Sequence, residues 1–252
     1  MRFPRVQFCM CAVAPSHLQR WLMAKAALVT GGSSGIGLAI ARALRDEGFE
    51  LTLAARTREK VEGAAKELDA LAVTANVAGE DDCRRAVEEH RARYGRLDVL
   101  VNSAGMGVDG SVDDMPTKHI DLQLDVNLRG LMLVTAAALP LLREAGGLVV
   151  NIASMAGTIP SPRLPVYGAT KAAVIQFTQT LNSAEEQHGV RATAISPGFV
   201  DTPMVETAPI PRERMIRPED CAEIVRMLLR LSRYARIPHV VVQRVSADGF
   251  GA

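Results

Sequence analysis

Residues 26–37 read AALVTGGSSGIG, so a short apolar run over 26–30 passes directly into a glycine-rich turn. The next residues, 38–44, have apolar positions at the spacing of a helix that packs on a sheet. Strand, glycine turn and helix in this order form the context that a dinucleotide-binding site requires. Glycines let the backbone approach a pyrophosphate, and the helix N-terminus offers free N–H groups. Because such turns also occur as simple connections, the prediction needs support from elsewhere in the chain.

A second pattern lies much later, where Tyr167 and Lys171 are four residues apart. In a helix this spacing places both side chains on one face. A phenol with a pKa near ~10 is a poor acid–base group at neutral pH, but an ammonium group one turn away favours its ionised form. The pair predicts a tyrosine whose pKa is lowered for acid–base chemistry. The alternative is that Tyr-x-x-x-Lys is merely a common helical spacing.

Taken in order, these motifs resemble those of the short-chain dehydrogenase/reductase family. Thr30-Gly31-x-x-x-Gly35-x-Gly37 is similar to the cofactor motif of that family. The other matches are Asn102-Ser103-Ala104-Gly105, with serine where the family has its second asparagine, then Asn127, Ser154 thirteen residues before Tyr167, and Pro197-Gly198. The resemblance covers roughly residues 23–252, nearly the whole chain.

The resemblance implies a role for each catalytic residue. Tyr167 would protonate a carbonyl oxygen as hydride arrives, and Ser154 would hydrogen-bond that oxygen. Lys171 would hold the ribose hydroxyls and lower the pKa of Tyr167, and Asn127 would fix a water that relays protons to Lys171. These residue types suit the reaction, because reduction of a carbonyl needs a proton donor and dipoles aimed at the developing oxyanion. The implied cofactor-binding residues are Gly31, Ser33, Ser34, Gly35, Ile36, Gly37, Arg56, Asn76, Val77, Asn102, Ala104, Gly105, Tyr167, Lys171, Pro197, Gly198 and Thr202.

The end of the second expected strand indicates which nicotinamide cofactor is used. NAD-selective members of the family carry an acidic residue where Ala55 stands, and Arg56 follows at once. A guanidinium suits the 2′-phosphate of NADP in charge and geometry, so the sequence predicts NADP(H). The alternative is that Arg56 is a solvated residue at a helix start. Asn76-Val77 stands where the family usually has the Asp-Val that touches adenine, and a carboxamide can still meet the adenine amino group.

The pattern of apolar runs predicts an α/β fold, a single doubly wound Rossmann domain over 23–252. We expect a seven-stranded, mainly parallel sheet with helices on both faces. The expected strands are 26–30, 50–55, 71–75, 97–101, 147–152, 190–196 and 239–244, and the helices are 35–47, 58–69, 81–94, 117–144, 164–188 and 218–232. Ligands bind at the carboxyl ends of such strands, where Gly31, Ala55, Asn76, Asn102, Ser154 and Pro197 fall.

Composition argues against several classes of partner. With 29 basic and 28 acidic residues the net charge is +1, and aromatic residues make up 4% of the chain. Neither value favours a nucleic acid or an anionic membrane, and no uninterrupted apolar stretch approaches the ~20 residues of a membrane span. Cys9, Cys11, Cys83 and Cys221 show no pairing or metal-ligand spacing, so we expect no disulfide, no metal and a cytoplasmic location.

Residues 1–22 precede the matched region and are expected to be an extension of it. Arg2 and Arg5 before an apolar segment loosely imitate a secretory signal. We favour the alternative that Met23 is the native start, because Met23-Ala24-Lys25 leads straight into the first strand.

The segment 131–142 is apolar almost all round. A surface helix should show a polar face, so both sides of this one should be covered. The sheet is one cover, and the second is either a loop or another subunit. The resemblance favours a homodimer or homotetramer that uses the helices carrying Asn127 and Tyr167.

The expected activity is therefore NADP(H)-dependent interconversion of a carbonyl and a secondary alcohol on a small substrate. The candidate pocket residues, all apolar, are Met155, Ile159, Phe199, Met204 and Val205. The C-terminal residues are similar to those of NADP-dependent 3-hydroxy acid and serine dehydrogenases, which makes a 3-hydroxy acid one candidate. The alternatives are a 3-oxoacyl-carrier-protein reductase and, from another class, a non-catalytic regulator that senses NADP.

Overall fold

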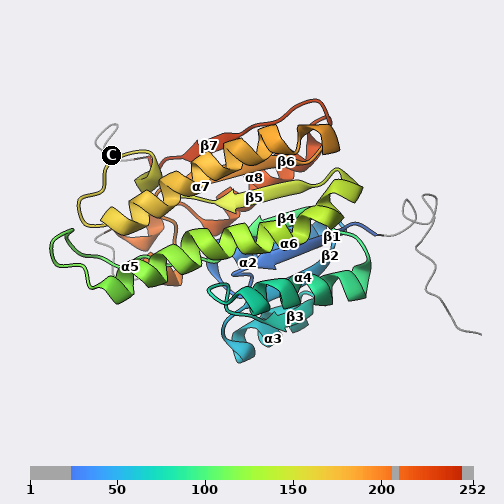
Figure 1. The fold of residues 1–252 in the computed structure, drawn as a ribbon, viewed down its shortest axis with the longest axis horizontal. Coiled ribbons are helices and arrows are strands. Elements are labelled where there is room, and N and C mark those ends of the chain that lie inside the picture. The colour runs from blue at the N-terminus through green and yellow to red at the C-terminus, as the bar shows by residue number, and fades with distance from the viewer. Residues whose placement is uncertain (1–23, 206–209, 246–252) are drawn as a thin grey trace, which may run out of the picture.

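The computed structural model describes residues 24–205 and 210–245 and is built on one seven-stranded sheet (Figure 1). The strand order is β3-β2-β1-β4-β5-β6-β7, and every neighbouring pair is parallel. The strands are β1 Ala26–Thr30, β2 Glu50–Ala55, β3 Leu71–Thr74, β4 Val99–Asn102, β5 Leu148–Ile152, β6 Arg191–Pro197 and β7 His239–Val242. The α/β fold and its seven strands are confirmed, and the sheet is wholly parallel rather than mainly so.

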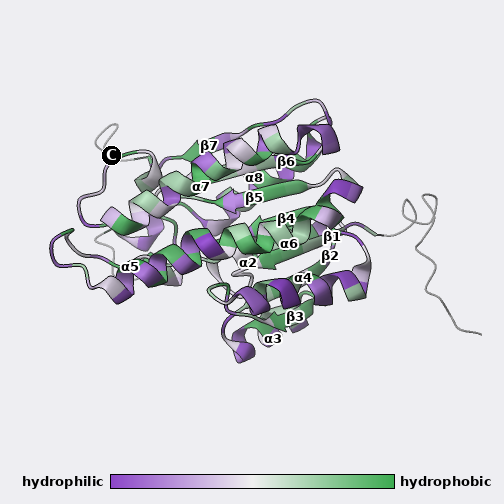
Figure 2. Cartoon of the chain, viewed as in Figure 1, coloured by the Kyte–Doolittle hydropathy of each residue, from purple (hydrophilic) through white to green (hydrophobic). Residues whose placement is uncertain are grey.

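Helices cover both faces of the sheet, as Figure 1 shows. One face packs against α2 Gly35–Asp46, α3 Arg58–Glu67 and α8 Pro218–Arg230. The other packs against α4 Glu80–Tyr94, α6 Gly130–Ala145 and α7 Pro165–Ala184. Successive strand residues alternate between the faces: Val29 belongs to the first core and Leu28 to the second. Strands buried on both faces are expected to be largely apolar. In Figure 2 the strands are mostly green, whereas the helices mix green with white and purple.

The strand order reverses between β1 and β4, which are neighbours in the sheet. From β1 the chain proceeds to β2 and β3 on one side, and from β4 it proceeds to β5, β6 and β7 on the other. At such a reversal the loops leave the carboxyl ends of the two strands in opposite directions, which opens a crevice. The fold therefore places a ligand site beside Gly31 and Asn102.

The long helix expected over 117–144 is interrupted. It consists of α5 Thr117–Leu124, a π-helical turn Asp125–Arg129 and α6. The helix expected over 164–188 ends at Ala184 and is followed by a short 3₁₀ turn, Glu186–His188. Gly189 then adopts φ 69°, a left-handed conformation that ends the helical path.

Residues 117–145 form one helix, among the described residues, that is long and apolar enough to cross a membrane by length and composition. The sequence led us to expect no such segment. The helix is this apolar because one of its sides faces the core. Leu131, Val134 and Leu142 on that side are buried in contact with the sheet and its neighbours. It is a core helix of the fold.

Candidate active site

A groove of about 330 Å³ runs along the carboxyl ends of the strands. It brings together most of the residues singled out from the sequence: Gly31, Ser33, Ser34, Gly35, Ile36, Arg56, Asn76, Val77, Ala104, Gly105, Ser154, Tyr167, Lys171, Pro197, Gly198 and Thr202 all line it. Of the predicted catalytic and cofactor-binding residues, Gly37, Asn102 and Asn127 lie outside its lining. A site assembled from six strand ends explains why residues so distant in sequence converge.

The glycine turn after β1 is shaped for a close backbone approach. Gly31 has φ +66°, and a Cβ there would lie 2.7 Å from the backbone nitrogen of Ala104. A Cβ on Gly37 would lie 2.4 Å from the carbonyl oxygen of Gly31, so Gly37 packs α2 against the turn instead of facing the groove. The N-cap residue Ser34 makes no side-chain cap bond. The first N–H groups of α2 are therefore available to an anion in the groove.

Asn102 ties strands to helices beneath the groove. It is 3% exposed, and its Nδ2 donates to Thr135 Oγ1 at 3.0 Å and to Asn151 Oδ1 at 2.9 Å. Asn151 in turn donates to Thr178 Oγ1 at 2.8 Å. Because buried polar groups need partners, this chain of amides and hydroxyls fixes α6 and α7 against β4 and β5. The structure places Asn102 in a supporting position, away from the cofactor contact we expected.

Asn127 sits in the π-helical turn and holds the loop that follows β4. Its Oδ1 accepts from the Met106 N–H at 2.8 Å, and its Nδ2 donates to the Met106 carbonyl at 2.8 Å and to Thr170 Oγ1 at 3.1 Å. Such π-turns occur mostly as single turns inside α-helices, frequently at functional sites. Here the turn aims a buried amide at the wall of the groove.

Ser154, Tyr167 and Lys171 meet because the turn after β5 packs closely on α7. A Cβ on Gly157 would lie 2.6 Å from the backbone of Lys171, and one on Gly168 would lie 2.7 Å from the Ala156 carbonyl. Sequence reasoning missed both glycines, although each lies within three residues of a catalytic candidate. Ser154 Oγ accepts from the Ala156 N–H at 3.2 Å, which orients its hydroxyl.

Lys171 is buried beside the tyrosine ring. Its Nζ donates to the Ile152 carbonyl at 2.8 Å and lies 5.5 Å from the centre of the Tyr167 ring. Removal from water disfavours the ammonium form and lowers the pKa of Lys171 to about 8. A lysine with this pKa changes charge near physiological pH.

The pKa of Tyr167 moves in the direction opposite to the one we expected. Desolvation in the groove raises it above its usual range, and a hydrogen bond with Ser154 partly offsets that rise. The prediction that the pKa of Tyr167 is lowered is therefore wrong for this structure, because desolvation of the phenol is the largest effect and Ser154, not Lys171, is the group that opposes it. A tyrosine that keeps its proton is suited to donate it.

The far end of the groove is exposed and basic. Arg56, Thr57 and Lys60 line it just after β2, and all three are exposed. Arg58 points into an ion pair with Glu62 at 3.0 Å, whereas Arg56 and Lys60 have no ion pair among the described residues. We did not foresee Thr57 and Lys60. The available signal was that the first turn of a helix after a strand end faces the ligand edge of the sheet.

Two of the five apolar pocket residues expected from the sequence line the groove. These are Met204 and Val205, whereas Met155, Ile159 and Phe199 lie outside its lining. Sequence reasoning missed further lining residues, most of them next to a motif residue: Met106, Val126, Ile152, Val200 and Pro203. Adjacency to a motif was the signal that could have found them.

No group of three His, Cys, Asp or Glu residues able to hold a metal ion occurs in the parts of the chain that the structure describes. Cys83 and Cys221 are free and buried. Burial raises the pKa of Cys83 to about 11 and that of Cys221 to about 12. Both thiols are protonated at neutral pH and behave as core residues.

A protein-family model and several known proteins are similar in sequence to most of this chain. The family model described as short chain dehydrogenase matches residues 25–212. An uncharacterized oxidoreductase from Staphylococcus epidermidis is 36% identical over 227 residues, which cover 88% of this chain and 97% of the relative. A counterpart from Staphylococcus aureus is 34% identical over 225 residues, with the same coverage of both chains.

Two solved structures superpose closely. An alcohol dehydrogenase from the archaeon Thermococcus sibiricus, complexed with 5-hydroxy-NADP, has a TM-score of 0.82 and 30% identity over 88% of this chain and 97% of its own. A 3-ketoacyl-(acyl-carrier-protein) reductase from Brucella melitensis, complexed with NADH, has a TM-score of 0.82 and 29% identity over the same shares. With the family model, the oxidoreductase relatives and the shared fold in agreement, the chain belongs to the short-chain dehydrogenase family of oxidoreductases.

Proposed function

We propose that this chain is an NADP(H)-dependent oxidoreductase that interconverts a carbonyl and a secondary alcohol on a small substrate. The observation that supports this proposal most is one groove with contrasting ends. Ser154, Tyr167 and Lys171 form a proton-donating cluster at one end, and the other end carries Arg56 and Lys60, two cations that make no ion pair with the described residues. NADP(H) requires a reactive site for its nicotinamide and a cationic site for its 2′-phosphate, and the two ends of the groove offer these. In our proposal the nicotinamide lies beside Tyr167 and the 2′-phosphate beside Arg56.

The residues between these ends suit a pyrophosphate. The turn at Gly31 and the uncapped start of α2 present backbone N–H groups with no side chain in the way. Thr202 approaches the same turn, since its Cγ2 would lie 3.0 Å from a Cβ on Gly35. In this proposal Thr202 adds a hydroxyl to the anion site.

In the direction of carbonyl reduction, Tyr167 acts as the general acid. When bound, the reduced nicotinamide supplies the hydride. Tyr167 donates its Oη proton to the carbonyl oxygen, and its raised pKa keeps that proton available at neutral pH. The Ser154 hydroxyl donates a hydrogen bond to the same oxygen and stabilises the charge that develops there.

In our proposal, Lys171 and Asn127 restore the proton that Tyr167 has donated. A Cβ on Gly105 would lie 3.3 Å from Lys171 Nζ and 3.4 Å from Asn127 Oδ1, so both groups border the same point of the groove wall. We propose that Asn127 holds a water there and that protons pass through it to Lys171. A lysine pKa of about 8 suits a group that gains and loses a proton in each cycle.

The preference for NADP(H) over NAD(H) rests on the end of β2. Ala55 offers no carboxylate to the ribose hydroxyls, and the exposed Arg56 and Lys60 can reach a 2′-phosphate. The solved alcohol dehydrogenase described above was obtained with an NADP derivative and the reductase with NADH. The fold alone therefore accommodates either nucleotide, and the choice falls to these side chains.

The substrate is proposed to be small, with a 3-hydroxy acid as one candidate. A 3-oxoacyl-carrier-protein reductase is the second candidate function, favoured by the superposition on a reductase of that name. Its substrate carries an acyl chain, which the apolar Met204 and Val205 could contact. Comparing free 3-oxo acids with their carrier-protein thioesters as substrates separates the two.

We further propose that the enzyme is a homodimer or homotetramer in the cytoplasm. The outer surface of the helix over 117–145 exposes apolar side chains, with Leu122, Leu124 and Met132 each exposed by 36–41%. A second copy of the chain would cover them. Size-exclusion chromatography with light scattering tests this proposal, and a monomer at micromolar concentration would contradict it.

The decisive experiment is turnover of NADPH and NADP⁺ with a panel of ketones, aldehydes and 3-hydroxy acids. We expect at least one pair to react and NADPH to be favoured over NADH. Tight binding of NADPH without turnover of any substrate would instead support a regulator that senses the nucleotide.

A further inference from the structure

The loop between β3 and α4 forms one wall of the groove. Asn76 and Val77 both line the groove there, although Asn76 is exposed to solvent. The Asn76 Oδ1 accepts from the Ala78 N–H at 3.2 Å, which fixes the orientation of the amide. Its amino group then has no partner among the described residues and is left for a ligand. A short exposed loop needs external support to hold such a group in place.

Asp82 supplies that support from the first turn of α4. Its Oδ2 accepts from the backbone N–H of Asn76 at 2.8 Å. An acidic residue at this third helical position commonly accepts from the N-cap N–H of its own helix. Here the N-cap is Gly79, and the carboxylate reaches past it into the loop. Asp82 therefore holds the groove wall rather than the helix end.

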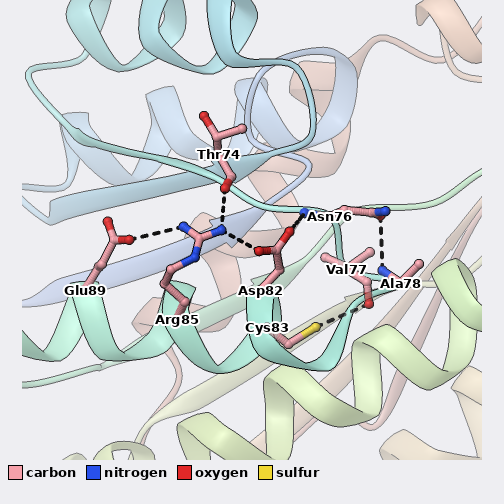
Figure 3. Close-up of polar contacts among 8 residues, drawn as sticks. All are labelled: Thr74, Asn76, Val77, Ala78, Asp82, Cys83, Arg85 and Glu89. Carbon is pink, nitrogen blue, oxygen red and sulfur yellow. Dashed lines mark hydrogen bonds and ion pairs between the residues drawn. The ribbon is translucent and has the colours of Figure 1, made fainter.

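Arg85 orients the Asp82 carboxylate. Figure 3 shows its guanidinium between three acceptors: Asp82 Oδ1 at 2.5 Å, the Thr74 carbonyl at 2.8 Å and Glu89 Oε1 at 3.2 Å. Thr74 is the last residue of β3. The pair thus connects the strand end, the loop and the helix. The Asn76 N–H first, and then Arg85, hold the pKa of Asp82 below its usual range, so Asp82 is ionised at neutral pH.

The inner side of the loop is closed by α6. A Cβ on Gly130 would lie only 2.3 Å from the Val77 carbonyl oxygen, and Cys83 Sγ donates to that oxygen at 3.2 Å. The loop cannot move inward because backbone already fills that space. Movement of the loop away from the sheet is opposed by the hydrogen bond from the Asn76 N–H to Asp82 Oδ2. Figure 3 shows Asp82 and Cys83 holding opposite ends of the Asn76–Val77 step.

We propose that Asp82 is a positioning residue which, oriented by Arg85, sets the place of Asn76 and Val77 and thereby the affinity for the adenosine half of the dinucleotide. The proposal rests on the function proposed above. In this proposal the two ends of the groove are independent. Affinity for the adenosine half of the dinucleotide depends on Asp82, whereas affinity for the nicotinamide half beside Tyr167 does not.

Equilibrium binding to the full chain tests this. The probes are NADPH, adenosine 2′,5′-bisphosphate and reduced nicotinamide mononucleotide, the last lacking the adenosine half. The variants are Asp82→Ala and Asp82→Asn, the latter keeping an acceptor and the size of the side chain. The matched control is Asp81→Ala, which removes an equal charge from the same helical turn. Asp81 is exposed and makes no hydrogen bond or ion pair with the described residues.

We expect Asp82→Ala to weaken binding of NADPH and adenosine 2′,5′-bisphosphate about 5-fold to 10-fold. This is less than the ~10-fold or more that a lost charge-assisted hydrogen bond to the ligand would cost, because Asp82 acts through Asn76. Asp82→Asn should weaken them less, because its Oδ1 still accepts from Asn76. Binding of the mononucleotide should stay unchanged in both variants, as should every affinity of Asp81→Ala. The kcat at saturating NADPH should also hold while KM rises, a split that general loss of structure would not produce.

Three outcomes would overturn the proposal. If both Asp82 variants bound the bisphosphate as tightly as the wild type, the positioning role of Asp82 would be rejected and the proposed function would remain intact. Equal weakening of the mononucleotide, or equal weakening by Asp81→Ala, would show a general structural or charge effect. If the wild type bound neither NADPH nor the bisphosphate, both this proposal and the proposed function would fail.

Discussion

The two ends of the groove are built in opposite ways. At the Tyr167 end, Lys171 is 4% exposed and Asn127 is 1% exposed, and each is bonded to backbone carbonyls. At the Arg56 end, Arg56 and Lys60 are exposed. The first end is fixed by packing before any ligand arrives, whereas the second offers mobile charges on long side chains.

This difference separates reaction chemistry from cofactor choice. A buried group is strongly coupled to its surroundings, so a small change there has a large effect on rate and on stability. Exposed charges are screened by water and salt, and each contributes little alone. We therefore expect changes at the Tyr167 end to be severe and changes at the Arg56 end to be graded.

The largest effect should follow Tyr167→Phe, which removes only the transferable proton. We expect kcat to fall by ~10²-fold to ~10⁴-fold, the usual contribution of general acid catalysis, while the Kd for NADPH changes little. Steady-state kinetics with fluorescence titration of NADPH measures both. Tyr234→Phe is the control, because Tyr234 is 84% exposed and lies outside the groove lining. A Tyr167 variant retaining more than a third of wild-type activity would exclude this residue as the acid.

Stability should depend on pH through Lys171. Its pKa is about 8 in the folded chain and 10.5 when unperturbed, so from pH 8 upward the unfolded chain holds a proton that the folded chain has lost. The free energy of unfolding should therefore rise with pH over this window, by about 3 kcal/mol in full. Above pH 9, Cys83 and Cys221 lower the free energy of unfolding as the pH rises, since burial raises their pKa values in the folded chain to about 11 and about 12, above the ordinary thiol value of 9.0.

Urea denaturation of wild type and Lys171→Met between pH 7 and pH 9 isolates the lysine. The wild-type curve should rise relative to that of the variant as the pH increases. Arg56→Gln is the control from the other end of the groove and should run parallel to wild type. Parallel wild-type and Lys171→Met curves would mean that Lys171 keeps an ordinary pKa despite its burial.

Cofactor choice should reverse with two substitutions at the end of β2. The wild type should favour NADPH over NADH by at least ~10-fold in kcat/KM, about 1.4 kcal/mol. Ala55→Asp with Arg56→Ser should favour NADH, because the carboxylate accepts from the ribose hydroxyls and repels a 2′-phosphate. Arg58→Ser is the control, since that side chain is engaged with Glu62. Equal efficiency of the wild type with both nucleotides would show that Arg56 points to solvent.

The smallest effect should follow Lys60→Met. A single exposed cation is worth ~0.2–1 kcal/mol, so we expect KM for NADPH to rise about 3-fold and KM for NADH to stay unchanged. Raising the salt concentration should shrink the difference, because the charge is screened. Arg58→Met again serves as the control. An equal rise for both nucleotides would assign Lys60 to the general fold of α3 and not to the phosphate.

The sequence alone determined the elements of this protein to a large extent. All seven strands begin and end within two residues of their expected bounds. Strands buried on both faces are continuous apolar runs, and the glycine and proline residues that form the turns between them are recognised from the local sequence. Most of the groove residues were implied by the family resemblance, and the rule that ligands bind at the carboxyl ends of parallel strands placed six strand-end residues at the same edge. Both inferences depend on chemistry that is visible within a few residues.

Only the tertiary structure decided the properties that depend on neighbours distant in sequence. The π-turn at Asn127, the direction of the pKa shift of Tyr167 and the placing of Asn102 behind the groove follow from packing among strands and helices far apart in the chain. Asp82 gave no signal in the sequence, because its partner is a backbone N–H on a loop whose place is set only in the folded chain, by α4 and α6. Desolvation and close packing are set by everything that surrounds a group, and that surrounding exists only once the chain has folded.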